Sequence, residues 1–229
     1  TFSDNVTATI TNSGTLLFNA TDAKSVTGTI AEATGGDTTE VQVINSANSE
    51  APSVVTFTAA VAADTLTIGT TTYGGAALFE EAVTTPTISV VGGDHADEDS
   101  TVTFNKAVTS SSGITLNDQT GDAKVIFAAN NSVTITGTID GASSDEGTLQ
   151  VTGATKTFAS VIGGTQALTL IDIDNTSIFN EAISATNINV AGSITATAKK
   201  AITATAIVLD AGTLVLSDNN SVTIAGTIN

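Results

Sequence analysis

Two groups of acidic side chains in the sequence could do chemistry. The segment 94–99 reads Asp-His-Ala-Asp-Glu-Asp and contains the one histidine of the chain. Carboxylate oxygens are ligands that Ca²⁺ prefers. The segment therefore offers a candidate calcium site made of Asp94, Asp97, Glu98 and Asp99. Its spacing is not that of an EF-hand, because Asp99 stands where that loop needs glycine. The alternative interpretation is a solvated loop between two repeats.

The second group is the pair Asp172 and Asp174, which alternates with Ile171 and Ile173. In a strand, both carboxylates would leave the same face about 6.5–7 Å apart. That separation is typical of inverting glycosidases. However, any strand that alternates aspartate with isoleucine produces the same pair, and Tyr73 is the only aromatic residue beyond the phenylalanines that could form a sugar platform. We therefore expect no enzymatic activity and assign no catalytic residue.

The composition excludes several classes of function. The 229 residues include 23 Asp and Glu against 6 Lys and Arg, a net charge of −17, and all the basic residues are lysine. A chain this acidic lacks the basic surface that nucleic-acid binding needs. The absence of cysteine excludes zinc fingers, thiol chemistry and disulfides. No apolar run approaches the roughly 18–20 residues that span a bilayer.

Short alternating runs, separated by Gly, Asn, Asp and Ser clusters, predict an all-β chain. These runs belong to repeats. One repeat has a phenylalanine followed three residues later by Ala and then by Val or Ile, and it starts at Phe57, Phe79, Phe104 and Phe179. A second repeat covers 127–139, recurs at 216–228 and has a degenerate copy at 18–30. Repeats of fixed length indicate a stacked architecture.

The spacing of the phenylalanines predicts the shape of that stack. The eight residues stand at positions 2, 18, 57, 79, 104, 127, 158 and 179, and most intervals are near 22. Almost all of them would occupy the same place in a repeat, and the interval of 39 before Phe57 would hide a coil without its Phe. We predict a β-solenoid with coils of about 22 residues, whose Phe side chains form one internal ladder. The alternative is a tandem pair of β-sandwich domains.

The organisation follows from this repeat. We expect residues 1–229 to form a single elongated solenoid, with a possible loop insertion at 92–100. The chain begins without an initiator Met or an apolar leader, so we expect it to be a segment of a larger protein. Its acidic exterior would keep a core of small β-branched residues in solution and would oppose chance pairing of strand edges.

The sequence pattern of the repeat resembles that of a family of bacterial surface proteins. The pattern Thr-Phe-Asn-x-Ala-Val at 103–108, followed by a strand such as 114–117 or 168–171, is similar to passenger regions of filamentous-haemagglutinin-like exoproteins and autotransporter adhesins. The resemblance covers roughly 54–229 and is one of composition and repeat order. It implies a right-handed parallel β-helix, export to the cell surface, and adhesion or surface coating. S-layer proteins share the acidic, Thr-rich, Cys-free composition and are the close competitor.

These observations lead to expectations about function. We expect a non-enzymatic structural or adhesive protein, extracellular or on the bacterial cell surface, with no nucleic acid among its partners. The expected partners are copies of itself, neighbouring repeats, and surface or host glycans and proteins. The first alternative is an S-layer or filament subunit that assembles through Ca²⁺ or by end-to-end strand stacking. The second is a carbohydrate-active β-helix or a tailspike-like piece. Calcium is the one candidate cofactor.

Overall fold

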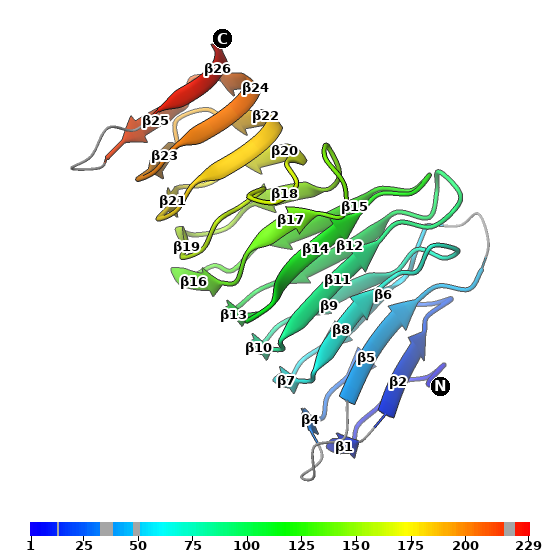
Figure 1. Cartoon of the computed structure of the whole chain (residues 1–229). Coiled ribbons are helices and arrows are strands. Elements are labelled where there is room, and N and C mark those ends of the chain that lie inside the picture. The colour runs from blue at the N-terminus through cyan, green and yellow to red at the C-terminus, as the bar shows by residue number, and fades with distance from the viewer. Residues whose placement is uncertain (13, 33–38, 48–50, 218–222) are drawn as a thin grey trace.

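The computed structural model describes residues 1–12, 14–32, 39–47, 51–217 and 223–229. Every regular element there is a β-strand. Strands β1 to β18 enter three parallel sheets in turn, and from β18 onward the strands alternate between two of these sheets. We call these sheets faces I, II and III. The chain makes about nine turns of roughly 22 residues each. In Figure 1 the near strands run toward the upper right, the far strands run back, and successive coils rise toward the C-terminus, which is a right-handed winding.

The strands of the three faces are as follows. Face I contains β1 (Ile10–Asn12), β4 (Ile30–Glu32), β7 (Val61–Ala62), β10 (Val83–Thr84), β13 (Val108–Thr109), β16 (Val133–Thr136), β19 (Lys156–Phe158), β21 (Ser177–Phe179), β23 (Thr195–Ala198) and β25 (Thr213–Leu216). Face II contains β2 (Gly14–Asn19), β5 (Thr39–Ile44), β8 (Thr65–Ile68), β11 (Thr87–Val91), β14 (Gly113–Asn117) and β17 (Ile139–Gly141). Face III contains β3 (Lys24–Val26), β6 (Val54–Phe57), β9 (Ala76–Phe79), β12 (Ser100–Phe104), β15 (Ala123–Phe127), β18 (Thr148–Val151), β20 (Leu168–Ile173), β22 (Ile183–Val190), β24 (Ile202–Leu209) and β26 (Ile224–Ile228).

Each strand pairs in parallel with its equivalents one coil below and one coil above. Ile114 of β14, for example, lies between Ile88 of β11 and Ile139 of β17. Alternate side chains point inward, so one coil adds a layer of Val, Ile, Leu or Phe to the core, and the next layer follows about 4.8 Å higher. All pairings between the named strands are parallel, which confirms the β-solenoid and rules out the tandem sandwiches.

The phenylalanines form one continuous stack through the core. Neighbouring ring centroids lie 4.6–5.6 Å apart at every step from Phe2 to Phe179. The internal aromatic ladder is therefore confirmed. Five steps are stacked, with interplanar angles of 7–23°. Two steps are edge-on, Phe18–Phe57 at 85° and Phe127–Phe158 at 80°.

The expectation that these residues occupy one place in a repeat is wrong. Phe18 belongs to face II, Phe57 through Phe127 to face III, and Phe158 and Phe179 to face I. The two edge-on contacts are the steps at which the stack changes face. The interval of 39 residues before Phe57 hides no coil, because the rings of Phe18 and Phe57 are direct neighbours. The interval is the sum of two parts. The chain first crosses one side of the solenoid, from Phe18 to Val26, and then makes one full coil from Val26 to its register partner Phe57.

The same sequence repeat also forms different corners of the solenoid. The copy that begins at Phe127 passes from face III to Ile135 on face I and Ile139 on face II, whereas the copy that begins at Phe18 passes from face II to Val26 and Ile30 on faces III and I. Residues 218–222 of the third copy lie outside the described residues.

Each copy has a glycine two residues before its final isoleucine, namely Gly28, Gly137 and Gly226; the first two lie at corners, and Gly226 lies within β26. A Cβ there would lie 1.7–2.2 Å from a backbone carbonyl oxygen of the coil below. The three positions thus share one steric requirement, which only glycine meets.

Candidate functional site

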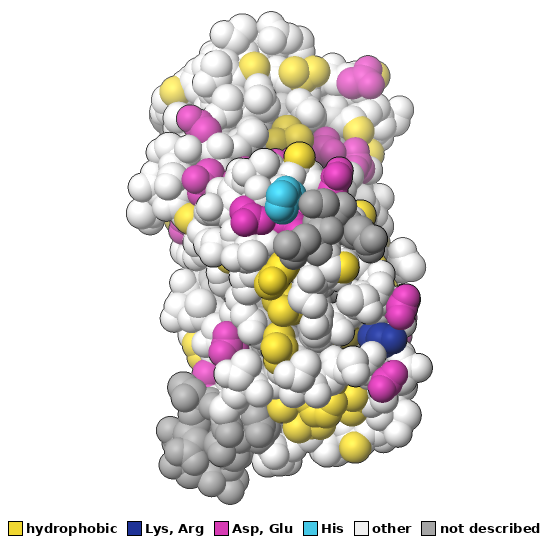
Figure 2. All heavy atoms as spheres, turned by 90° about the vertical axis from the view of Figure 1, so that its right-hand side faces the viewer, with side chains coloured by type: hydrophobic (Ala, Val, Ile, Leu, Met, Phe, Trp, Pro, Cys, Tyr) yellow, Lys and Arg dark blue, Asp and Glu magenta, His cyan; other side chains and the backbone are white. Residues whose placement is uncertain are grey.

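A row of corner loops lies on one edge of the solenoid, where face II turns into face III. It includes the corner loops 69–75, 92–99, 118–122 and 142–147, which lie along the right-hand side of Figure 1. Figure 2 views this edge and shows acidic side chains around the histidine. The candidate metal-binding segment is therefore part of a row of corner loops, each placed over the loop of the coil below.

Within loop 92–99, the four predicted metal ligands have different environments. Glu98 is buried, and its Oε2 accepts a hydrogen bond of 3.3 Å from the backbone N–H of His95. Asp94 and Asp97 are exposed, and Asp94 Oδ1 lies 3.6 Å from Nε2 of His95. Asp99, also exposed, accepts a 2.8 Å hydrogen bond from the backbone N–H of Asp122 in the next coil. Two of the four carboxylates, those of Glu98 and Asp99, thus accept hydrogen bonds from backbone N–H groups.

The neighbouring corner uses its carboxylates in the same way. Asp118 accepts hydrogen bonds from the backbone N–H groups of Ala123 at 2.7 Å and of Gly147 at 2.8 Å, so it ties three successive parts of the edge together. Across the described ranges, no three His, Asp or Glu side chains gather into a group that could hold a metal ion. Calcium ligation by loop 92–99 remains a prediction.

The charges on this edge affect one another. Burial raises the pKa of Asp122 above its ordinary value, and the nearby carboxylates of Asp99 and Asp118 raise that pKa further. A raised carboxyl pKa means that the ionised form is disfavoured in the folded chain. The edge therefore carries electrostatic repulsion, which salt or a bound cation would reduce.

The pair Asp172 and Asp174 projects from the end of β20 on face III. Nε2 of Gln150, one coil below, donates to Oδ2 of Asp174 at 2.6 Å and to Oδ2 of Asp172 at 3.4 Å. The two carboxylates are thus brought together and share one amide donor. The pKa of Asp172 is raised by burial and by Asp174, while Lys124 opposes that rise. An amide that bridges the pair occupies the place where a glycosidase would hold its water or sugar.

The flat faces present rows of small polar side chains. On face II, Thr67, Ser89 and Thr115 follow one another in register. Below them, Glu40 accepts hydrogen bonds from the hydroxyls of Thr15 at 2.9 Å and of Thr67 at 3.3 Å. Hydrogen bonds between carboxylates and hydroxyls therefore link adjacent coils along the outer surface.

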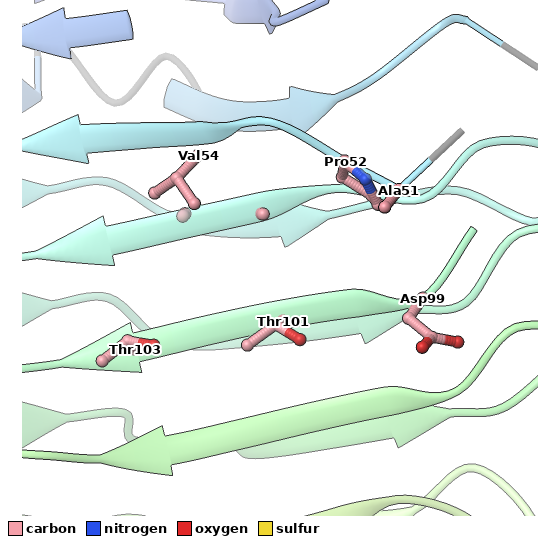
Figure 3. A pocket seen from close by; sticks show the side chains of 8 residues that line it. Ala51, Pro52, Val54, Asp99, Thr101 and Thr103 are labelled. Carbon is pink, nitrogen blue, oxygen red and sulfur yellow. The ribbon is translucent and has the colours of Figure 1, made fainter. Parts of the chain in front are cut away.

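Face III carries a shallow hollow of about 310 Å³ near the loop edge. Figure 3 shows Thr101 and Thr103 on β12 and Val54 on β6, with Pro52 and Ala51 at the rim and Asp99 at the start of β12. Val54 is 41% exposed, which is high for a valine. The hollow is open and largely apolar, and it does not contain the ring of converging polar groups that a small-molecule site requires.

One buried charge was not predicted from the sequence. Lys156 of β19 points into the core and is fully buried. Its Nζ donates to the backbone oxygen of Ala129 at 2.8 Å and to that of Ala154. Burial lowers the pKa of Lys156 to about 8. The alternation of Lys156 with Phe158 on one strand was the signal that could have found it, since residues two apart point to the same side.

Comparisons with known proteins add no identification. No protein-family model, no curated protein and no solved structure matches the chain. Within the described residues, no helix is long and apolar enough to cross a membrane.

Proposed function

We propose that this chain is a rod-like structural or adhesive segment of a bacterial cell-surface protein and that it has no enzymatic activity. The observation that carries the proposal is the unbroken stack of parallel coils around one aromatic column, with polar rows on the outside. Such a stack supplies reach and stiffness, since each coil pairs with its neighbours in at least two parallel sheets. A rod of this kind works by display: its outward faces and corner loops make many weak contacts at once.

Two features of the candidate site support a binding role over catalysis. The one carboxylate pair that resembles a glycosidase site is tied to Gln150. The histidine lies in an exposed corner loop beside Asp94. Nucleophilic catalysis needs a base within hydrogen-bond distance of the nucleophile and a third group that orients the base. The surroundings of His95 instead suit a loop that is solvated and negatively charged.

Surface labelling tests this proposal directly. Antibodies raised against the chain should label intact cells of the bacterium that produces it, and external protease should remove the label. A cytoplasmic protein probed on the same cells serves as the control. Labelling only after the cells are made permeable would refute a surface location. Turnover of any glycan, lost in Asp172→Asn, would refute the absence of enzymatic activity.

The acidic edge favours a second candidate, a lattice or filament subunit bridged by Ca²⁺. The exposed carboxylates of loop 92–99 and its neighbours repel an equivalent edge of a second rod, and a divalent cation would remove that repulsion. Light scattering of the chain should then rise with CaCl₂ and fall again with EGTA. Asp97→Asn should weaken the response, because Asp97 is exposed and holds no backbone group. Scattering that is indifferent to both reagents would exclude this candidate.

A further inference from the structure

Two neighbouring corners of unequal length lie where face III turns into face I. Phe104 and Phe127 are paired in register, and so are Val108 and Ile135 beyond the corner. Three residues separate Phe104 from Val108 in the lower corner, whereas seven separate Phe127 from Ile135 in the upper corner. We call this longer upper corner the ledge.

An open polar hollow of about 410 Å³ lies between the two corners. Its lining consists of Asn105 and Lys106 on the lower corner and Asn130 and Asn131 on the ledge. The lining contains no carboxylate, although the chain as a whole carries a charge of −17. Glu80 and Glu81 occupy the equivalent corner one coil below, and neither lines the hollow. This is a local concentration of hydrogen-bond donors on an acidic protein.

The donors in this hollow are free to bind a ligand. Among the residues that the structure describes, the side chains of Asn105, Lys106, Asn130 and Asn131 take part in no hydrogen bond or ion pair with the protein. An amide side chain offers two N–H donors and one oxygen acceptor, and an ammonium offers three donors and a positive charge. Hydroxyl groups donate and accept and so match amides, while a carboxylate matches the ammonium.

The ledge is held in place before any ligand arrives. The backbone oxygen of Ala129 accepts hydrogen bonds from Nζ of Lys156 and from the N–H of Ala154, each 2.8 Å long. On the floor, the N–H of Asn105 donates to the oxygen of Phe79 at 2.9 Å. Lys156 also places a second positive charge directly behind the ledge. A backbone that is held in this way loses little conformational entropy when a ligand binds.

We propose that this hollow binds an acidic saccharide unit, with the carboxylate on Lys106 and the ring hydroxyls on the three asparagine amides. A simple anion would use the ammonium alone and leave the amides without partners. A neutral sugar would leave the ammonium unused. The inference rests on the proposed surface function only in taking glycans as the natural ligand class. The test of this inference measures sugar binding, whereas the test of the proposed function measures surface location, so either proposal can fail while the other stands.

Side-chain amide resonances provide the test. The ¹⁵N-labelled chain is titrated with sodium glucuronate, galacturonate or N-acetylneuraminate, with glucose as the neutral match and acetate as the bare carboxylate. At least one acidic sugar should shift the amide signals of Asn105, Asn130 and Asn131 in a saturable way. Asn189, on face III, should not move. No shift with any of the three acidic sugars overturns the proposal, and so does an equal response to acetate, which would mean anion binding only.

Variants separate the charge from the amides. Lys106→Gln should weaken binding of the responsive acidic sugar about tenfold, because it removes one charge-assisted hydrogen bond. Lys199→Gln is the matched control, since Lys199 is exposed on a different corner, and should leave the affinity unchanged. Asn130→Ala should weaken binding of the acidic sugar and leave the weak response to acetate as it is. Equal affinities in Lys106→Gln and Lys199→Gln would exclude this site.

Discussion

The buried lysine allows a sharp test of how the core tolerates charge. Lys156 is fully buried, and its ammonium contacts two backbone oxygens and no carboxylate. Burial lowers its pKa from 10.5 in the unfolded chain to about 8 in the folded chain. The interval between these values corresponds to roughly 3 kcal/mol of preference for the neutral form on folding. We expect the free energy of unfolding to depend on the protonation of this one group.

The sign of the dependence follows from proton binding. Below pH 8 the lysine is protonated in both states, and the folded chain carries the full cost of the buried charge. As the pH rises from 8 to 10.5, the folded chain has lost the proton that the unfolded chain still holds, so stability increases. Above that interval both states are neutral and the gain levels off. Lys156→Met has no such group, and its profile lacks this rise.

Urea denaturation followed by far-UV circular dichroism measures the effect. The stability of the wild type minus that of Lys156→Met should climb by roughly 3 kcal/mol across the interval. The difference cancels the other titrating groups, which the two proteins share. Lys199→Met, at an exposed lysine, should give a flat difference. A flat difference for Lys156→Met as well would falsify the reasoning, because it would mean that the buried ammonium titrates as it does in water.

Three further changes test the core, the corners and the outer surface. Phe104→Ala removes a ring from the middle of the stack and should lower the free energy of unfolding by about 3–5 kcal/mol in the same assay. Phe2→Ala, at a partly exposed ring, should lower it by less. Equal losses in the two variants would contradict the stack as a source of stability. Gly137→Ala places a Cβ 2.2 Å from the oxygen of Ser110 at a φ of +123°, so we expect a loss of about 1–3 kcal/mol, and a neutral result would contradict the steric argument for the corner. Asp172→Asn should raise the urea midpoint at neutral pH, because burial and Asp174 raise the pKa of Asp172 and its charge therefore opposes folding. That gain should shrink in acid, where the wild-type carboxyl takes up its proton, and a midpoint lowered at neutral pH would contradict it.

Much of the fold is readable in the sequence because each coil repeats the same local requirements. Alternation of polar and apolar residues marks strands, and an interval near 22 residues marks the coil. The corner to which each copy of the repeat belongs is not readable. Phe57 and Phe158 are followed by similar residues, yet one ends a strand of face III and the other ends a strand of face I. The reason is physical: the corners after Phe57 and Phe158 both need an inward apolar residue and a short turn, so the local pattern is the same at each.

The candidate site was harder to predict than the fold. The acidic segment 94–99 stands out in the sequence, but composition says nothing of Glu98 turning inward to hold the loop. The hollow under Asn130 and Asn131 depends on two neighbouring corners of unequal length. Recognising it requires knowing which coil lies above which, and that register is settled by stacking in three dimensions. Lys106 alone, in a repeat that reads as a turn, carries no such information.

The interchangeable corners have a consequence for how such a chain can change over generations. A duplication of one whole coil lengthens the rod and leaves every surface where it was. A duplication of a single side with its corner would place the same glycine and inward residues at another corner, as the copies that contain Gly28 and Gly137 already do. It would, however, turn everything beyond it by a third of a revolution. The Phe stack changes face at its two edge-on steps, so one sequence pattern presents its surface in three directions along the same rod.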